Sequence, residues 1–207
     1  YQMSSTGRDD ALAKDATNNH FWRYDMRRLS AEEVRDSILW ANETLNADRM
    51  YGPSIYTDIP AEVKAGQSQP GSGWGKSSPE DEARRSIYIH VKRSLLDPIL
   101  ESFDMADTDQ TCPVRFTTTQ PTQALGLLNS EFIQEQAALF SDMLQEKYPD
   151  APKAQVKAAL ERTTQRPATD ADVARGLELI KSLQQDHNMD TQQARRYFCL
   201  MAFNLNE

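Results

Sequence analysis

The sequence predicts a mainly α-helical fold: a single irregular helical domain with one long Gly/Pro-rich loop and little or no sheet. Apolar residues recur every three or four positions over most of residues 121–207, which is the spacing of an amphipathic helix. Residues typical of helix starts precede these apolar runs. Four prolines and five glycines interrupt residues 47–79, so no long regular element is expected there. The 207 residues are enough for one sizeable domain, and we assign 1–207 to it.

The N-terminal part of the chain contains one strong helix signal. Residues 1–20 are polar and aperiodic, and we expect them to form a peripheral arm. Ser30 and Glu33 have the spacing of a capping box, in which each side chain accepts a hydrogen bond from an otherwise unpaired backbone amide. This signal predicts a helix over about 31–46. Residues 47–79 then form a long loop.

The pattern over residues 86–95 fits either a strand or a helix. Ile87, Ile89 and Val91 alternate with polar residues, as in a half-buried strand. Ile87, Val91 and Leu95 also lie on one face of a helix. We favour the helix.

The remaining predicted helices each begin at a recognisable signal. Shorter helices are predicted after Ser78-Pro79 and from Asp97-Pro98 to Phe103. The helices of the second half are predicted to begin at Pro121, Ser130, Asp150, Thr169 and Asp190, with a break at Arg166-Pro167. Residues 121–207 are therefore the helical C-terminal half.

The overall charge argues against a general nucleic-acid-binding role. The net charge is −8 at pH 7, and the paired basic residues are scattered among acids rather than gathered in one patch. No apolar run approaches the roughly 18 residues that a membrane span needs. The chain starts without Met and stops after an apolar run, so we expect a fragment of a larger protein.

Cysteine and histidine spacing predicts no metal or haem site in this piece. Cys112 and Cys199 form neither a C-x-x-C nor a C-x-x-C-H motif. Cys199 lies in the apolar run YFCLMAF, which predicts a buried, inert thiol. The three histidines share no ligand spacing. We expect no cofactor within this chain.

One group of residues has the chemistry of a weak candidate active site. It comprises Cys112 and Arg115, with Asp104 and Gln123 on either side in sequence. Arg115 would favour the thiolate form of Cys112, although the sequence assigns no histidine as its base. The other interpretation, which we favour, is a loop held by arginine and threonine hydrogen bonds.

The Gly-rich segment PGSGWGKSS at residues 70–78 suggests a second candidate, a ligand-binding site. Its glycine spacing does not fit a phosphate-binding loop. Trp74, with Tyr56 or Tyr88, would instead form a platform on which a sugar ring stacks. An ordered coil pinned by Trp74 is the alternative.

Several segments together resemble a known family. They are Phe21–Ser37, Gly52–Tyr56, Ile59–Ser77, the block Arg84–Asn129 and the pair Arg166-Pro167. In these segments the chain resembles a C-terminal domain family of unknown function, number fifteen-fifty-three, found in large exported proteins of planctomycetes and related bacteria. Val91 stands where that family commonly has Trp, and one residue fewer separates the Cys-x-x-Arg and Pro-x-Gln-Ala-Leu motifs.

The resemblance implies a setting rather than a reaction. It implies upstream domains in the same polypeptide, a c-type cytochrome module carrying haem c elsewhere in the parent protein, and a periplasmic or cell-envelope location. It carries over no catalytic residues.

Our leading hypothesis is a non-catalytic helical interaction or structural module. Its partners would be the upstream domains of the same polypeptide, another protein, or a polysaccharide. The alternative is an enzyme or carbohydrate-binding domain acting in polysaccharide breakdown, with its site near Cys112, Arg115 and the Gly-Trp loop.

Overall fold

The computed structural model describes residues 3–109 and 111–205, and within these ranges it confirms the mainly α prediction. The helices are α1 (Asp9–Leu12), α2 (Ala31–Ala41), α3 (Ala61–Ala65), α4 (Pro79–Glu82), the 3-10 helix η1 (Ser86–Tyr88), α5 (Pro98–Ser102), α6 (Pro121–Asn129), α7 (Glu131–Lys147), α8 (Pro152–Thr164), α9 (Asp170–Asp186) and α10 (Thr191–Phe203). The described residues form only isolated β-bridges and no sheet.

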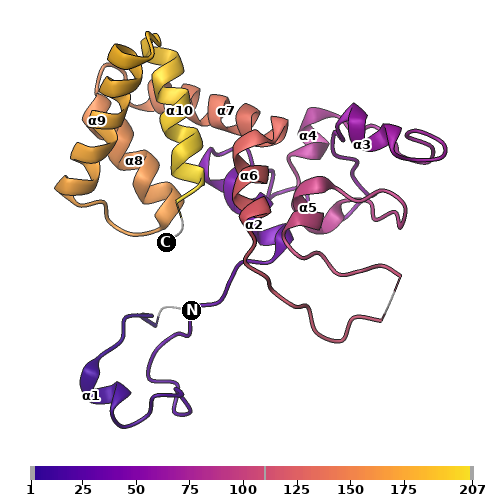
Figure 1. Cartoon of the computed structure of the whole chain (residues 1–207), viewed down its shortest axis with the longest axis horizontal. Helices are drawn as coiled ribbons and strands as arrows, with labels where there is room; N and C mark the ends of the chain where they lie inside the picture. Colours follow the sequence, from indigo (N-terminus) through magenta and orange to yellow (C-terminus); the bar gives the residue numbers. More distant parts are fainter. Residues whose placement is uncertain (1–2, 110, 206–207) are drawn as a thin grey trace.

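The four C-terminal helices pack into a bundle, with α10 against both α7 and α9 and α8 against α9 (Figure 1). Phe140, Val156 and Phe198 are buried at its centre. Gly176 on α9 allows the close approach of α8 and α10, because a Cβ there would lie 2.6 Å from Val156 Cγ1. The hydrophobic core continues from this bundle into α2 and α5, so the helices share one core.

Helix α2 begins where the capping box predicts and ends earlier. The Ser30 backbone amide donates to the Glu33 carboxylate at 2.8 Å, which confirms the box. The predicted end at residue 46 is wrong, because Ala41 is the last helical residue. The chain turns at Glu43, which has a φ of 64°, a left-handed conformation that no helix can continue through.

The predicted helix over residues 86–95 is wrong, because only the 3-10 turn η1 forms there, and the strand-like alternation does not describe this segment either. After η1 the backbone is extended, and two hydrogen bonds join it to Ile55. Ile89 is 6% exposed, whereas Ile87 is 69% and Val91 is 47% exposed. Residues two apart lie on the same face of a strand, so the strand-like pattern would have buried all three, and the structure buries only Ile89. Only an isolated bridge forms, so the segment is not part of a sheet.

The predicted caps differ in their outcome. Asp97 and Asp190 accept hydrogen bonds from the first turns of α5 and α10, and Thr169 does so for α9. The Asp150 prediction is wrong, because Ala151 is the N-cap of α8 and Asp150 takes a left-handed φ of 53°. The predicted N-cap of α8 therefore lies one residue before the observed one.

Arg84 fixes the start of the 47–79 loop. Its side chain is fully buried and donates hydrogen bonds to the backbone carbonyls of Arg49, Tyr51 and Pro53 at 3.2, 2.5 and 3.0 Å. The guanidinium carbon lies 4.3 Å from the centre of the Tyr88 ring. A charged donor shared by three carbonyls holds this loop against the domain.

The N-terminal segment lies apart from the helical body in Figure 1. Its own hydrogen bonds hold it together: the Trp22 indole donates to the Asp15 carbonyl at 2.9 Å, and the Asn18 amide donates to the Arg23 carbonyl at 2.9 Å. It joins the body through the stretch that leads into α2.

Candidate functional site

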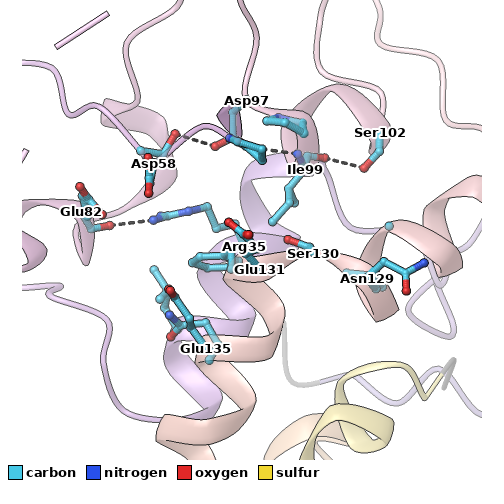
Figure 2. A pocket seen from close by; sticks show the side chains of 18 of the residues that line it. Arg35, Asp58, Glu82, Asp97, Ile99, Ser102, Asn129, Ser130, Glu131 and Glu135 are labelled. Atoms are coloured by element: carbon cyan, nitrogen blue, oxygen red, sulfur yellow. Dashed lines mark hydrogen bonds between the residues drawn. The ribbon is translucent and has the colours of Figure 1, made fainter. Parts of the chain in front are cut away.

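A cavity of about 740 Å³ opens between the 47–79 loop and the helices around it. Helices α2, α4 and α5 contribute to its walls, together with residues 57–62, the C-terminal end of α6 and the first turns of α7. Residues from across the first two-thirds of the chain therefore meet around one space. Figure 2 shows this cavity from close by.

Arg35 lies in the wall of the cavity, on the buried face of α2. Its side chain donates to the Glu82 carbonyl at 2.7 Å and to the Ser86 hydroxyl at 3.2 Å, and it lies 5.0 Å from the centre of the Phe132 ring. Burial lowers the pKa of the Arg35 guanidinium, and nearby carboxylates including Asp97 oppose this effect. The hydrogen bonds hold the guanidinium in one place.

Asp97 joins the loop to the helical body. Its carboxylate accepts hydrogen bonds from the backbone amides of Ile99 and Leu100 at 3.0 and 3.2 Å, which caps α5. It also accepts the Thr57 hydroxyl at 2.7 Å. Asp97 thus sets the position of one cavity wall, and its charge also acts on Arg35.

Acidic side chains dominate the charge of the cavity. Within the described residues, its lining includes the carboxylates of Asp58, Glu62, Glu82, Asp97, Glu131 and Glu135. Arg35 is the only basic side chain among the described lining residues. Burial raises the pKa of the Glu82 carboxyl, and the Asp58 and Glu135 carboxylates raise it further, while Arg35 and Lys76 oppose them. A cation held beside Glu82 would relieve this repulsion.

The cavity has two different ends. Asp58 and Glu82 lie at one end, and Ser102, Asn129 and Ser130 lie toward the other (Figure 2). The larger apolar side chains of the lining are Leu39, Ile99, Phe103, Leu127, Phe132 and Leu139, and Pro60, Pro79, Ala83 and Pro98 also line it. The site therefore offers acidic side chains at the Asp58 and Glu82 end and neutral polar and apolar side chains toward the other, with Asp97 and Glu131 between them.

The acidic residues do not form a metal centre. Among the residues that the structure describes, no group of three or more histidine, cysteine, aspartate or glutamate side chains is arranged to hold a metal ion. The carboxylates of the cavity are spread over its walls rather than converging on one point.

The predicted Cys112 and Arg115 candidates lie in an exposed loop outside the cavity. The Cys112 thiol donates to the Val114 carbonyl at 3.3 Å. Arg115 donates to both oxygens of Glu32 at 2.6 and 3.0 Å, and this carboxylate raises the pKa of the guanidinium. Arg115 therefore fastens the loop to the first turn of α2.

Asp104 and Gln123 meet through Thr118 and close the same loop. The Asp104 carboxylate accepts the Thr118 amide at 2.6 Å and its hydroxyl at 2.9 Å. The Gln123 side chain donates to the Ser102 carbonyl at 2.9 Å and the Thr118 carbonyl at 3.3 Å, and accepts from Arg28 at 2.6 Å. The structure thus brings Asp104 near Gln123, and neither residue lines the cavity.

The predicted ligand-binding aromatics divide into two places. Trp74 is half-buried, donates its indole hydrogen to the Thr57 carbonyl at 2.9 Å, and packs edge-on to Tyr56 with ring centres 5.7 Å apart. Tyr88 lies instead on Arg84. The structure therefore brings Trp74 and Tyr56 together. The hydrogen bond from Trp74 to Thr57 links this pair to the cavity wall.

Sequence reasoning missed the cavity residues. Arg35, Glu82 and Glu135 come from three helices that are far apart in the chain. One signal was available: Arg35 stands four residues after Ala31 and three before Ile38, on the apolar face of a predicted helix. A charged residue on such a face has to find buried partners.

Comparisons with known proteins show the family of this chain. No described helix is long and apolar enough to cross a membrane. No curated protein and no solved structure matches the chain. The family model described as "PSD1: Protein of unknown function (DUF1553)" matches residues 1–180. That match covers most of the 207 residues, so the chain belongs to the PSD1 family of proteins of unknown function.

Proposed function

We propose that this domain is a non-catalytic recognition module whose cavity holds a segment of another protein domain. The observation that carries the proposal is the cavity of about 740 Å³, which has both apolar and carboxylate side chains in its lining. Ligand sites in proteins typically have volumes of about 300–1,000 Å³, and this space has room for several side chains. Covering its apolar lining would provide binding energy.

The partners of the catalytic candidates support recognition rather than catalysis. Arg115 is paired with Glu32, and Asp104 and Gln123 hold Thr118 in place. These side chains act together as clamps on the loop between α5 and α6. Their polar groups are engaged within the domain itself.

The proposed partner is a neighbouring domain of the same polypeptide. The family resemblance supports a parent protein with upstream domains, haem c on a cytochrome module, and a periplasmic or cell-envelope location. A partner attached by a short linker acts at an effective concentration near the millimolar range, so modest affinity for the cavity is enough.

Gly126 provides the test of this proposal. It lines the cavity near the end of α6, and no atom lies within 4 Å of the position that a Cβ would take. A Cβ at this position would therefore meet no wall, and we expect the Gly126→Trp side chain to occupy part of the space. Ala124→Trp is the matched control, because Ala124 is exposed on the same helix and does not line the cavity.

The measurement is hydrogen exchange of the full-length parent polypeptide compared with this chain alone. We expect residues 99–103 and 126–132, which contribute to the lining, to exchange more slowly in the parent. Gly126→Trp is expected to remove this extra protection, and Ala124→Trp to retain it. Equal exchange in the parent and in the isolated chain would refute docking at the cavity.

An enzyme of polysaccharide breakdown is the second candidate function. The observation that favours it is Glu82, a carboxyl with a raised pKa beside Asp58 and Glu135. Glycoside hydrolysis uses one protonated and one ionised carboxyl group. Release of reducing sugar from a panel of polysaccharides, lost in Glu82→Gln, would establish this function. If no polysaccharide of the panel releases reducing sugar, this enzymatic function is eliminated for that panel.

A further inference from the structure

We infer that the segment recognised by the cavity carries a lysine or arginine beside an apolar side chain, with its cation at the Asp58, Glu82 and Glu135 end. This inference rests on the proposed function and adds the chemistry of the occupant. Three features carry it: the charge of the lining, the separation of charge from apolar surface, and the fixed guanidinium of Arg35.

Charge complementarity is the first feature. The described lining has six carboxylates and one guanidinium, on a chain whose net charge is −8. In the described structure no lysine or arginine nitrogen lies within 4.0 Å of the Glu82 or Glu135 carboxylates. Lys64 approaches Asp58 at 3.5 Å, but that aspartate side chain is 89% exposed and the pair is weak. A cation from another segment would meet carboxylates that have no strong partner.

The separation of charge from apolar surface is the second feature. Asp58 and Glu82 lie at one end of the cavity (Figure 2), while Ile99 and Leu127 contribute apolar surface toward α5 and α6. Lysine and arginine carry long aliphatic stems that pack on apolar surface while the charged head stays near water. A basic residue followed by an apolar one would fit both parts of this lining.

Arg35 adds selectivity. Its guanidinium is held by the Glu82 carbonyl and the Ser86 hydroxyl, and its side chain is 3% exposed. Because this guanidinium lies at the Glu82 end, it would repel a second cation brought to the same carboxylates. The site therefore favours one basic residue with apolar neighbours over a run of consecutive basic residues.

The direct test titrates this chain with capped five-residue peptides, followed by NMR. The probe is acetyl-Gly-Leu-Lys-Leu-Gly-amide, and the comparison peptides replace lysine with norleucine or glutamate, or replace both leucines with lysine. Because a charge-assisted hydrogen bond is lost, we expect the norleucine peptide to bind at least roughly tenfold more weakly. We expect the glutamate and three-lysine peptides to bind more weakly than the probe. Equal binding of the lysine and norleucine peptides would overturn the inference.

A double variant, its control and a change of ionic strength assign the binding to the cavity. The double variant Glu82→Gln and Glu135→Gln is expected to weaken the lysine peptide roughly tenfold and to leave the norleucine peptide unchanged. Glu80→Gln is the matched control, since Glu80 is exposed on α4 and does not line the cavity. Raising the ionic strength from about 0.05 to about 0.5 M should weaken only the lysine peptide, because salt screens exposed charges.

Failure of the inference can be separated from failure of the proposed function. If Gly126→Trp abolishes domain docking while the double glutamine variant leaves it intact, the cavity is a docking site and the basic occupant is wrong. If Gly126→Trp leaves docking intact, the proposed function is wrong. In that case, binding of the lysine peptide still decides whether the cavity recognises a cation. Binding of none of the peptides would overturn the inference directly.

Discussion

Replacing Arg84 with methionine should destabilise the domain more than any nearby surface substitution. The Arg84 side chain is fully buried and donates to three backbone carbonyls of the 49–53 segment. It also stacks on the Tyr88 ring. Methionine has a similar length and no hydrogen-bond donor, so the packing is roughly kept while the polar contacts are lost.

The magnitude follows from these contacts. Each buried carbonyl left without its donor costs about 1–3 kcal/mol. The segment is partly open to water, since Tyr51 is 81% exposed, so the lower half of that range applies. Loss of the cation–π contact adds about 0.5–2 kcal/mol. With three carbonyls at about 1–2 kcal/mol each and the lost cation–π contact, the expected loss of unfolding free energy is about 3.5–8 kcal/mol.

Urea denaturation measures this loss, with Arg85→Met as the matched control. The Arg85 side chain is 53% exposed and contacts Asp36 at 3.4 Å, so its removal should cost less than about 1 kcal/mol. Hydrogen exchange should also become faster over residues 49–55 in the Arg84 variant. Equal stability of the two variants would refute the role assigned to Arg84.

Further predictions concern packing, thiol reactivity and pH. Gly176→Ala should lower the free energy of unfolding by about 1–3 kcal/mol, because the new methyl group would lie 2.6 Å from a valine of α8. Gly126→Ala, in open space, should raise it by up to about 1 kcal/mol. Thermal unfolding compares the two variants. Cys112 should react with a thiol reagent in the folded protein, whereas Cys199, whose pKa burial raises to about 12, should react only after unfolding. The salt bridge with the neighbouring arginine lowers the pKa of Glu33 from 4.5 to about 2. Its contribution to stability is therefore complete above pH 4.5 and is lost as the pH falls toward 2, so the stability difference from Glu33→Gln should shrink over that interval.

Local signals account for the parts of the fold that the sequence predicted. Ser30 with Glu33, Thr169 and Asp190 all cap helices through contacts within three residues, and all were recognised. The interactions lie within one turn of backbone, so the pattern itself contains them. The start of each of these helices needs no partner from elsewhere in the chain.

Long-range contacts explain where the prediction was wrong. The backbone of Ile89 extends because it pairs with Ile55, and nothing near Ile89 in sequence identifies that partner. The cavity was missed for the same reason, since Arg35 and Glu135 are one hundred positions apart. Asp104 and Gln123 were named only as members of the weak candidate site around Cys112, and Thr118 joins them in the structure. The favoured interpretation, a loop held by arginine and threonine hydrogen bonds, agrees with these contacts, but the sequence did not identify their partners.

The most direct test of a recognition role for the cavity is a photo-cross-linking residue placed at position 126 of the full-length parent polypeptide. Gly126 faces open space in the cavity lining, so a reactive ring there would contact the occupant. We predict one dominant cross-link, to a segment outside this domain that carries a lysine or arginine beside an apolar residue. The same group at Ala124 should give no such product. Equal cross-linking from both positions, or none to another domain, would contradict docking at the cavity.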